Sequence, residues 1–117
     1  MNQSCFNRTR NTTIAETVKR ADNFFTRFKG LLGTKSLPVG QGLLLSPCKQ
    51  IHMIGMKYAI DAVFVDTDLK VVAVIHSIGP GQISPLIKTA RSCLELPAGI
   101  AIETETVVGD QLELIDQ

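Results

Sequence analysis

The strongest constraint on the fold is a series of short apolar runs rich in β-forming residues, which extends from residue 43 almost to the C-terminus. The runs are LLLSP, QIHMIGM, IDAVFV, VVAVIHSI, SCLELP and QLELI, and turn-forming segments such as DTDLK and GPG separate them. Short strands at regular spacing are typical of barrels and curved sheets. We therefore predict a mainly β (α+β) fold: a compact, barrel-like, strongly curved sheet of short strands with one or two short helices.

The first third of the chain predicts a hairpin followed by a helix. SCFNRTRNTTIAETVKRAD has the pattern of two short strands around a turn at Arg10 and Asn11, because Asn tolerates the left-handed backbone of a tight turn. In DNFFTRFKGLLG, Asp22 suits an N-cap, apolar residues recur at helical spacing, and Gly33 suits the C-terminal position. The pattern leaves open whether the hairpin closes the barrel or remains an edge.

Composition limits the class of protein. The 117 residues, 44% hydrophobic and 20% charged, suit a single domain over residues 1–117. No apolar run approaches the ~20 residues of a membrane helix, and the polar N-terminus has no signal-peptide pattern, so we expect a cytoplasmic protein without membrane insertion. The three cysteines lack a CxxC pair and fit free thiols. A net charge of +1, scattered Lys and Arg, and few aromatics argue against a nucleic-acid partner.

The segment SPCKQIHMIGMKYAID concentrates residue types that bind soft metals. Cys48, His52 and Met56 are spaced four residues apart. A strand would separate Cys48 from His52 by about 13 Å, and a helix would place Met56 about 12 Å from Cys48. We predict a strand over QIHMIGM, since Pro47 and Gly55 oppose a helix. A metal would need ligands from other strands, and we expect neither a metal nor another cofactor.

The same segment also suggests a thiol nucleophile. A catalytic cysteine needs a base within hydrogen-bond reach, which this spacing denies along a strand. The remaining arrangements use Cys93, or bring His76 to Cys48 across the sheet. The interpretation with most support is a packed core, with a small buried Cys, adaptable Met side chains and one hydrogen-bonded His.

A polar pocket is a further hypothesis. Strand alternation places Arg91, Cys93 and Glu95 on one face, where Arg91 and Glu95 can pair beside a thiol. An exposed strand face explains these residues equally well. If that face meets His52 and Asp61 across the sheet, the result is a small pocket suited to a carboxylate or phosphate ligand.

Five segments in order resemble a known family: RFKGLLG, SLPVGQGLLLSPCKQIHMIGMKYAIDAVFVD, VVAVIHSIGPG, ARSCLELPAG and VVGDQLEL. The chain resembles the domain-of-unknown-function family 192, a widespread group of small prokaryotic proteins, over about residues 14–114. The most specific parts are the Cys-x3-His-x3-Met series and LELPAG. The resemblance implies a barrel-like β domain and no particular activity. It also marks as site candidates Cys48, His52, Met56, Asp61 and Glu95.

We therefore expect an uncharacterised cytoplasmic binding or accessory domain with a polar pocket for a small anionic ligand or a peptide. Arg91 would hold the anion, Glu95 or Asp61 would orient it, and His52 would add a hydrogen bond; the full set of candidates is Cys48, His52, Met56, Asp61, Arg91 and Glu95. The alternative is a thiol- or metal-dependent hydrolase or transferase that uses Cys48 or Cys93 with His52 or His76. A third class is a partner domain with an exposed sheet edge. The sequence leaves the enzyme question, the ligand, the partner and the oligomeric state open.

Overall fold

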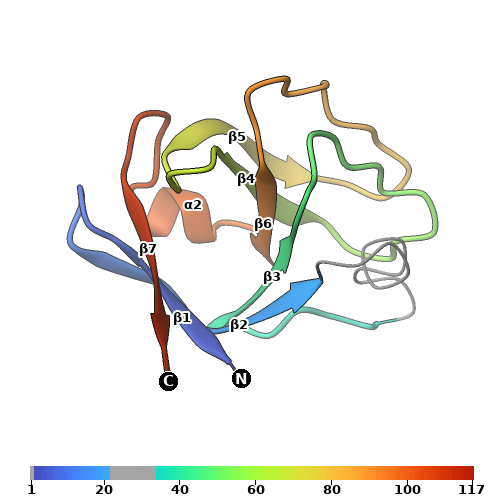
Figure 1. Ribbon diagram of the computed structural model, residues 1–117. Helices are drawn as coiled ribbons and strands as arrows, with labels where there is room; N and C mark the ends of the chain where they lie inside the picture. Colours follow the sequence, from blue (N-terminus) through green and yellow to red (C-terminus); the bar gives the residue numbers. More distant parts are fainter. Residues whose placement is uncertain (1, 22–33) are drawn as a thin grey trace.

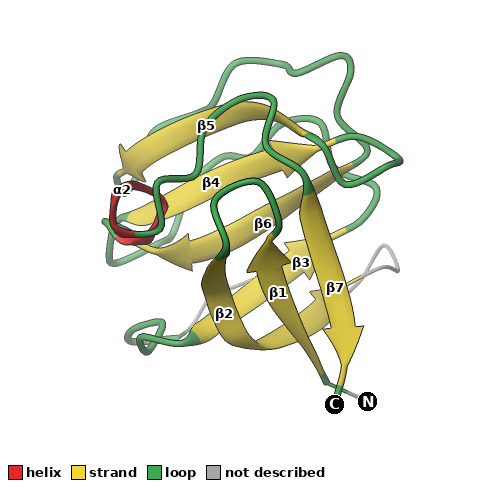
Figure 2. Ribbon diagram, turned by 90° about the vertical axis from the view of Figure 1, so that its left-hand side faces the viewer, coloured by secondary structure: helices red, strands yellow, loops and turns green. Residues whose placement is uncertain are grey.

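One curled sheet organises the chain in the computed structural model, which describes residues 2–21 and 34–117. The described elements are β1 (Gln3–Asn7), β2 (Thr12–Ala21), β3 (Gln41–Leu45), β4 (Ile60–Val65), β5 (Val71–Ile78), β6 (Ser92–Pro97), α2 (Ile100–Glu103) and β7 (Leu112–Asp116). Within these ranges the strand order is β5-β4-β6-β3-β2-β1-β7. The sheet curls into a half-barrel (Figure 1, Figure 2), which confirms the predicted mainly β, barrel-like fold. The helix predicted for residues 22–33 lies outside the described residues.

The N-terminal hairpin forms as predicted. β1 and β2 are antiparallel, and Asn11 in the turn has a φ of 59°. β1 also pairs with β7, so the hairpin lies within the strand order, and the outermost described strands are β5 and β7. A bridge between Lys70 and Gln111 brings the turn after β4 to the start of β7. The two ends of the curled sheet therefore come close together at this bridge.

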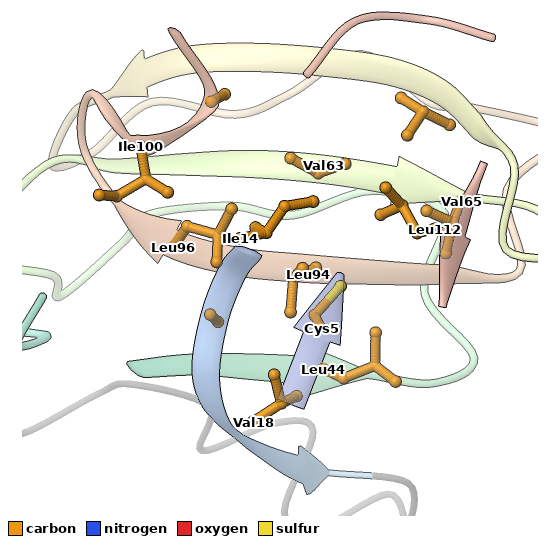
Figure 3. Packing of buried hydrophobic residues seen from close by; sticks show 13 residues of the cluster. Cys5, Ile14, Val18, Leu44, Val63, Val65, Leu94, Leu96, Ile100 and Leu112 are labelled. Carbon is orange, nitrogen blue, oxygen red and sulfur yellow. The ribbon is translucent and has the colours of Figure 1, made fainter. Parts of the chain in front are cut away.

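Strand alternation produces two apolar clusters on opposite faces of the sheet. The inner cluster fills the half-barrel (Figure 3) and includes Leu94 and Leu96 of β6 with Val63 of β4. The outer cluster contains Cys93 of β6 and Phe64 of β4, together with residues from the two loops that cover them. β6 is thus buried on both faces.

The loops over the outer face correct one prediction. Residues 50–56 are not a strand: His52 makes an isolated bridge with Ile83, and the Met56 amide donates to the Met53 carbonyl over 3.1 Å. The physical reason is Gly55, whose φ of 84° supports a tight turn that an extended strand does not contain. The neighbouring backbone therefore pairs with a second loop instead of entering the sheet.

We call residues 46–59 and 79–91 together the arm. Its two segments join through backbone hydrogen bonds: the Met53 amide to Gln82 at 2.7 Å, the Ser84 amide to Ile51 at 2.8 Å, and the Cys48 amide to Arg91 at 2.9 Å. Figure 1 shows the segments side by side beyond β3 and β5. The arm forms a second layer over the outer cluster.

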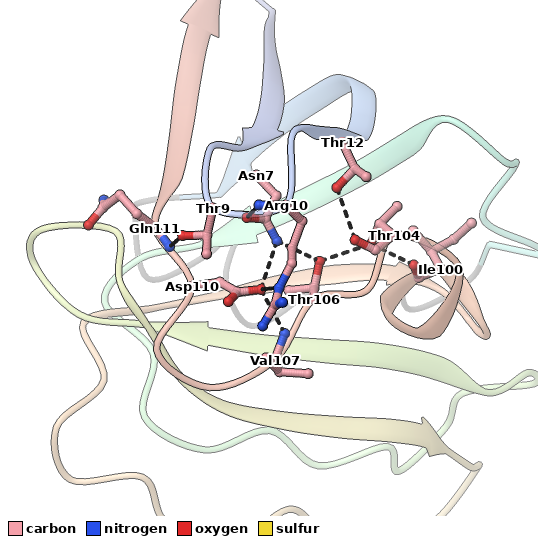
Figure 4. A network of polar contacts seen from close by, with 10 residues as sticks. All are labelled: Asn7, Thr9, Arg10, Thr12, Ile100, Thr104, Thr106, Val107, Asp110 and Gln111. Atoms are coloured by element: carbon pink, nitrogen blue, oxygen red, sulfur yellow. Dashed lines mark hydrogen bonds and ion pairs between the residues drawn. The ribbon is translucent and has the colours of Figure 1, made fainter.

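Polar contacts tie the N-terminal hairpin to the connection between α2 and β7 (Figure 4). The Asn7 amide donates to Thr106 Oγ1 at 3.2 Å and to Asp110 Oδ2 at 3.0 Å. Arg10 Nε donates to the same Asp110 oxygen at 3.1 Å. Asn7, Thr106 and Asp110 are all buried, so these bonds satisfy polar groups that water does not reach.

No helix within residues 2–21 and 34–117 combines the length and the apolar composition that crossing a membrane requires.

Candidate functional site

Glu95 is a buried carboxyl group on the outer face of β6. Its side chain is 7% exposed, and it makes no hydrogen bond or ion pair with another described residue. Burial raises the pKa of Glu95 to about 8, and the negative charge that Cys48 would carry as a thiolate adds to the rise. Near neutral pH this carboxyl group therefore holds its proton.

Two thiols from separate segments meet beside Glu95. Cys48 in the arm is partly buried, Cys93 on β6 is fully buried, and their side chains share a hydrogen bond. Burial raises the pKa of Cys93 well above its ordinary value, and the bond with Cys48 and the nearby negative charges raise it further. Both cysteines are reduced. Of the two thiols, Cys48 is the one that solvent reaches.

Asp61 lies on the opposite face of the sheet. It pairs in register with Leu96, whose side chain belongs to the inner cluster. The fully buried carboxylate accepts backbone N–H bonds from Ser77 at 2.9 Å, Gly99 at 3.0 Å and Ala101 at 2.9 Å. The structure therefore does not bring Asp61 to Glu95, and its oxygens fasten β5 and α2 to β4.

The cationic and imidazole candidates lie at the surface. His52, His76 and Arg91 are exposed, and the side chains of the two histidines form no hydrogen bond with the described part of the chain. The pairing of Arg91 with Glu95 suggested by strand alternation does not form. The physical reason is that Arg91 precedes β6 and projects into solvent, whereas Glu95 lies under the arm.

Methionine side chains contribute to the apolar surroundings of the thiols. Met53 is 1% exposed and Met56 is partly buried, and both belong to the outer cluster with Cys48. Over the residues that the structure describes, no group of three or more His, Cys, Asp or Glu side chains is arranged to hold a metal ion. Of the six candidates from the sequence, the structure gathers Cys48, Met56 and Glu95 around the outer cluster.

The outer surface of the arm carries cations without acids. Neither arm segment contains Asp or Glu, and the exposed cationic residues are Lys49, Lys57, Lys88 and Arg91. Large aliphatic side chains of the same two segments are also exposed: Ile54 is 64% exposed, Ile83 60% and Leu86 55%. Exposed clusters of this kind mark interaction surfaces more often than isolated apolar residues do.

The three lysines of the arm are candidates that motif analysis missed. A signal was present, because residues 23–60 and 69–94 contain no acidic residue. The net charge of the whole chain is close to zero and does not reveal these long segments without acidic residues. The two loops that carry the cations pair only in the folded chain.

The inner cluster contains a small cavity of about 10 Å³, lined by Cys5, Leu44, Val65, Leu69, Leu94, Leu112 and Leu114. A water molecule in such a cavity would lack polar partners. The cavity therefore provides no binding chemistry.

Comparison with known proteins places these features in context. The DUF192 family model, described as Uncharacterized ACR, matches residues 6–114. A UPF0127 protein of Thermococcus sibiricus is 28% identical over 111 residues, which cover 92% of this chain and 71% of that protein.

Two solved structures share the fold. A protein of unknown function from Novosphingobium aromaticivorans has a TM-score of 0.82 and 19% identity, over 97% of this chain and 84% of that one. A "putative transcription regulator" from Sinorhizobium meliloti has a TM-score of 0.84 and 21% identity, over 97% and 92% of the two chains.

Proposed function

Because the chain belongs to the DUF192 family, which is described only as uncharacterised, we propose a function from the arm itself. The protein is a cytoplasmic binding module, and its arm holds an acidic, apolar segment of a partner protein. The observation that carries the proposal is that the arm exposes both cations and large aliphatic side chains, without an acidic residue in either segment.

Charge complementarity favours an acidic segment as the binding partner of the arm. An acidic segment would meet Lys49, Lys57, Lys88 and Arg91 without a competing carboxylate from the same surface. Complementary charge steers association and disfavours cationic partners. All of the acidic residues lie outside the two arm segments, as in α2 and β7, so the chain distributes its charges unevenly.

The aliphatic residues favour a peptide over a nucleic acid. Ile54, Ile83 and Leu86 offer apolar contacts, whereas binding single-stranded nucleic acid relies on aromatic stacking. In this proposal Arg91 and His52 contact the partner's carboxylates. Cys48, Met56 and Glu95 support the arm from below, and Asp61 holds the underlying strands in place.

The test uses a fluorescent peptide of alternating Glu and Leu residues and measures its anisotropy with the full chain. We expect saturable binding that weakens as salt rises, because salt screens exposed charges. Lys88→Glu combined with Arg91→Glu should weaken binding by about tenfold or more, equivalent to at least roughly 1.4 kcal/mol. Ile54→Ser should also weaken binding.

The matched control is Lys19→Glu combined with Lys70→Glu, which changes the net charge equally at two exposed positions outside the arm. This variant should bind the peptide as the wild type does. Equal weakening in both double variants would refute a specific surface. Tighter binding of a single-stranded oligonucleotide, with the same dependence on Lys88 and Arg91, would refute the peptide as the occupant.

A further inference from the structure

We infer that Cys48 and Cys93 form a binding site for one monovalent soft metal ion, Cu(I), held between their two sulfur atoms. The ligands come from the arm and from β6. The spacing of Cys48, His52 and Met56 predicts that a metal at Cys48 needs a ligand from another strand, and Cys93 supplies it.

The geometry of the thiol pair is the first support. The Cys48 amide donates to the Arg91 carbonyl over 2.9 Å, two residues before Cys93, which anchors the arm beside the start of β6. The two side chains are already hydrogen-bonded to each other. Because the two thiols are in hydrogen-bonding contact, one ion between them can bind both sulfur atoms. Partial exposure of Cys48 provides an entry path.

The number of ligands selects the metal. Zinc prefers four ligands in a tetrahedral arrangement, and no third His, Cys, Asp or Glu in the described residues completes such a group. Thiolate and thioether ligands select Cu(I). A closed-shell monovalent ion of this type accepts two thiolates in a near-linear arrangement, which the pair can provide alone.

The surroundings of the pair are the second, independent support. Glu95 is a buried polar side chain, 7% exposed, without a hydrogen-bond partner among the described residues, and it lies beside Cys48. Cys48 Sγ also donates to the Gln50 carbonyl over 3.4 Å, and both thiols belong to the outer cluster, which contains Met53 and Met56. A buried polar group without a hydrogen-bond partner is unusual in a folded protein, and a functional role is one explanation for it.

Copper binding exchanges two thiol protons for one Cu(I) ion. Each thiol loses its proton to solvent, two sulfur–copper bonds form, and copper stays in the +1 state, so no electrons are exchanged. The resulting pair of thiolates with one Cu(I) carries one negative charge.

The test titrates the reduced full chain, without oxygen, into Cu(I) held by a coloured chelator such as bicinchoninate. We expect the wild type to withdraw one copper per chain, seen as loss of the chelator's absorbance. X-ray absorption should show two sulfur neighbours around the copper. Cys48→Ser should abolish the withdrawal, and it changes a partly exposed loop residue, so the fold should persist in circular dichroism.

Cys5→Ala is the matched control, because Cys5 lies in the inner cluster, on the other face of the sheet. This variant should still withdraw one copper per chain. The inference is wrong if the chelator keeps its copper in the presence of wild-type chain. It is equally wrong if Cys48→Ser withdraws copper as the wild type does, or if the copper neighbours are only nitrogen and oxygen.

Discussion

Glu95 and Asp61 are both buried carboxyl groups, but their hydrogen-bonding environments differ. Three backbone N–H groups donate hydrogen bonds to Asp61, whereas Glu95 has no such donor among the described residues. The two side chains lie on neighbouring strands but on opposite faces of the sheet. Their environments, and not their residue types, therefore decide what each carboxyl group does.

Glu95 makes stability depend on pH. Its folded pKa of about 8 lies above the ordinary value of 4.5, so the folded state holds a proton that the unfolded state releases between these values. Stability should fall as pH rises across this window, by up to roughly 5 kcal/mol, and level off above it. Glu95→Gln should remove most of this slope in urea unfolding measured from pH 5 to pH 8.

The control for this slope is Glu113→Gln, because Glu113 is a partly exposed carboxylate on β7. This variant should keep the pH dependence of the wild type. An unchanged slope in Glu95→Gln would show that Glu95 is ionised in the folded state.

At the level of elements, β3 and β6 approach closely because β3 contains Gly42. A Cβ atom added there would lie 3.2 Å from Leu96 Cδ2 and 3.3 Å from Leu94 Cδ1, both in the inner cluster. These side chains are held by packing from several strands, so they cannot move freely to make room. The close contact between β3 and β6 depends on this glycine.

Gly42→Ala should therefore destabilise the fold by about 1–3 kcal/mol, the usual cost of overpacking a core. Thermal unfolding followed by circular dichroism measures the change. Gly79→Ala is the matched control, since its added Cβ meets only the flexible side chain of Gln82, at 3.3 Å. If the two variants have the same melting temperature, the close packing of β3 against β6 does not depend on Gly42.

At the level of the whole molecule, buried polar contacts join the N-terminal hairpin to the C-terminal part of the chain. Asp110 is 2% exposed and accepts bonds from Asn7, Arg10 and the Val107 amide. Burial opposes its ionisation, but these bonds and the charge of Arg10 lower the pKa of Asp110 below its ordinary value. Ionised Asp110 therefore stabilises the closure of the half-barrel.

Asp110→Asn should reduce stability at pH 7 by about 2 kcal/mol, because bonds to a charged group are lost. The native stabilisation is present above the ordinary pKa of 3.8 and disappears as pH falls through the lower folded value. The difference between variant and wild type should thus shrink at pH 3, as urea unfolding at both pH values measures.

The exposed Arg8–Glu113 ion pair provides the comparison, since it joins β7 to the same hairpin. Glu113→Gln should cost less than about 1 kcal/mol at either pH, the usual range for a surface pair. A cost for Asp110→Asn that does not change with pH would assign its effect to packing.

Local patterns predicted most of the strands and the hairpin turn, because alternation and turn residues act over a few positions. The exception is QIHMIGM, which has strand composition but contains the turn at Gly55. Its apolar residues Ile51 and Met53 pack on the sheet from outside, which the same composition permits. Composition alone does not distinguish a strand within the sheet from a loop that covers it.

The β-rich, curved fold, the family resemblance and the alternation that places Cys93 and Glu95 on one face of β6 all follow from the sequence. The contact of Cys48 with Cys93, the position of Asp61 on the other face and the pairing of the two cation-bearing loops emerge only in the folded chain. This division arises because periodicity sets the face of a residue within its own strand. Its neighbours depend on strand order and on loop pairing between residues far apart in the chain.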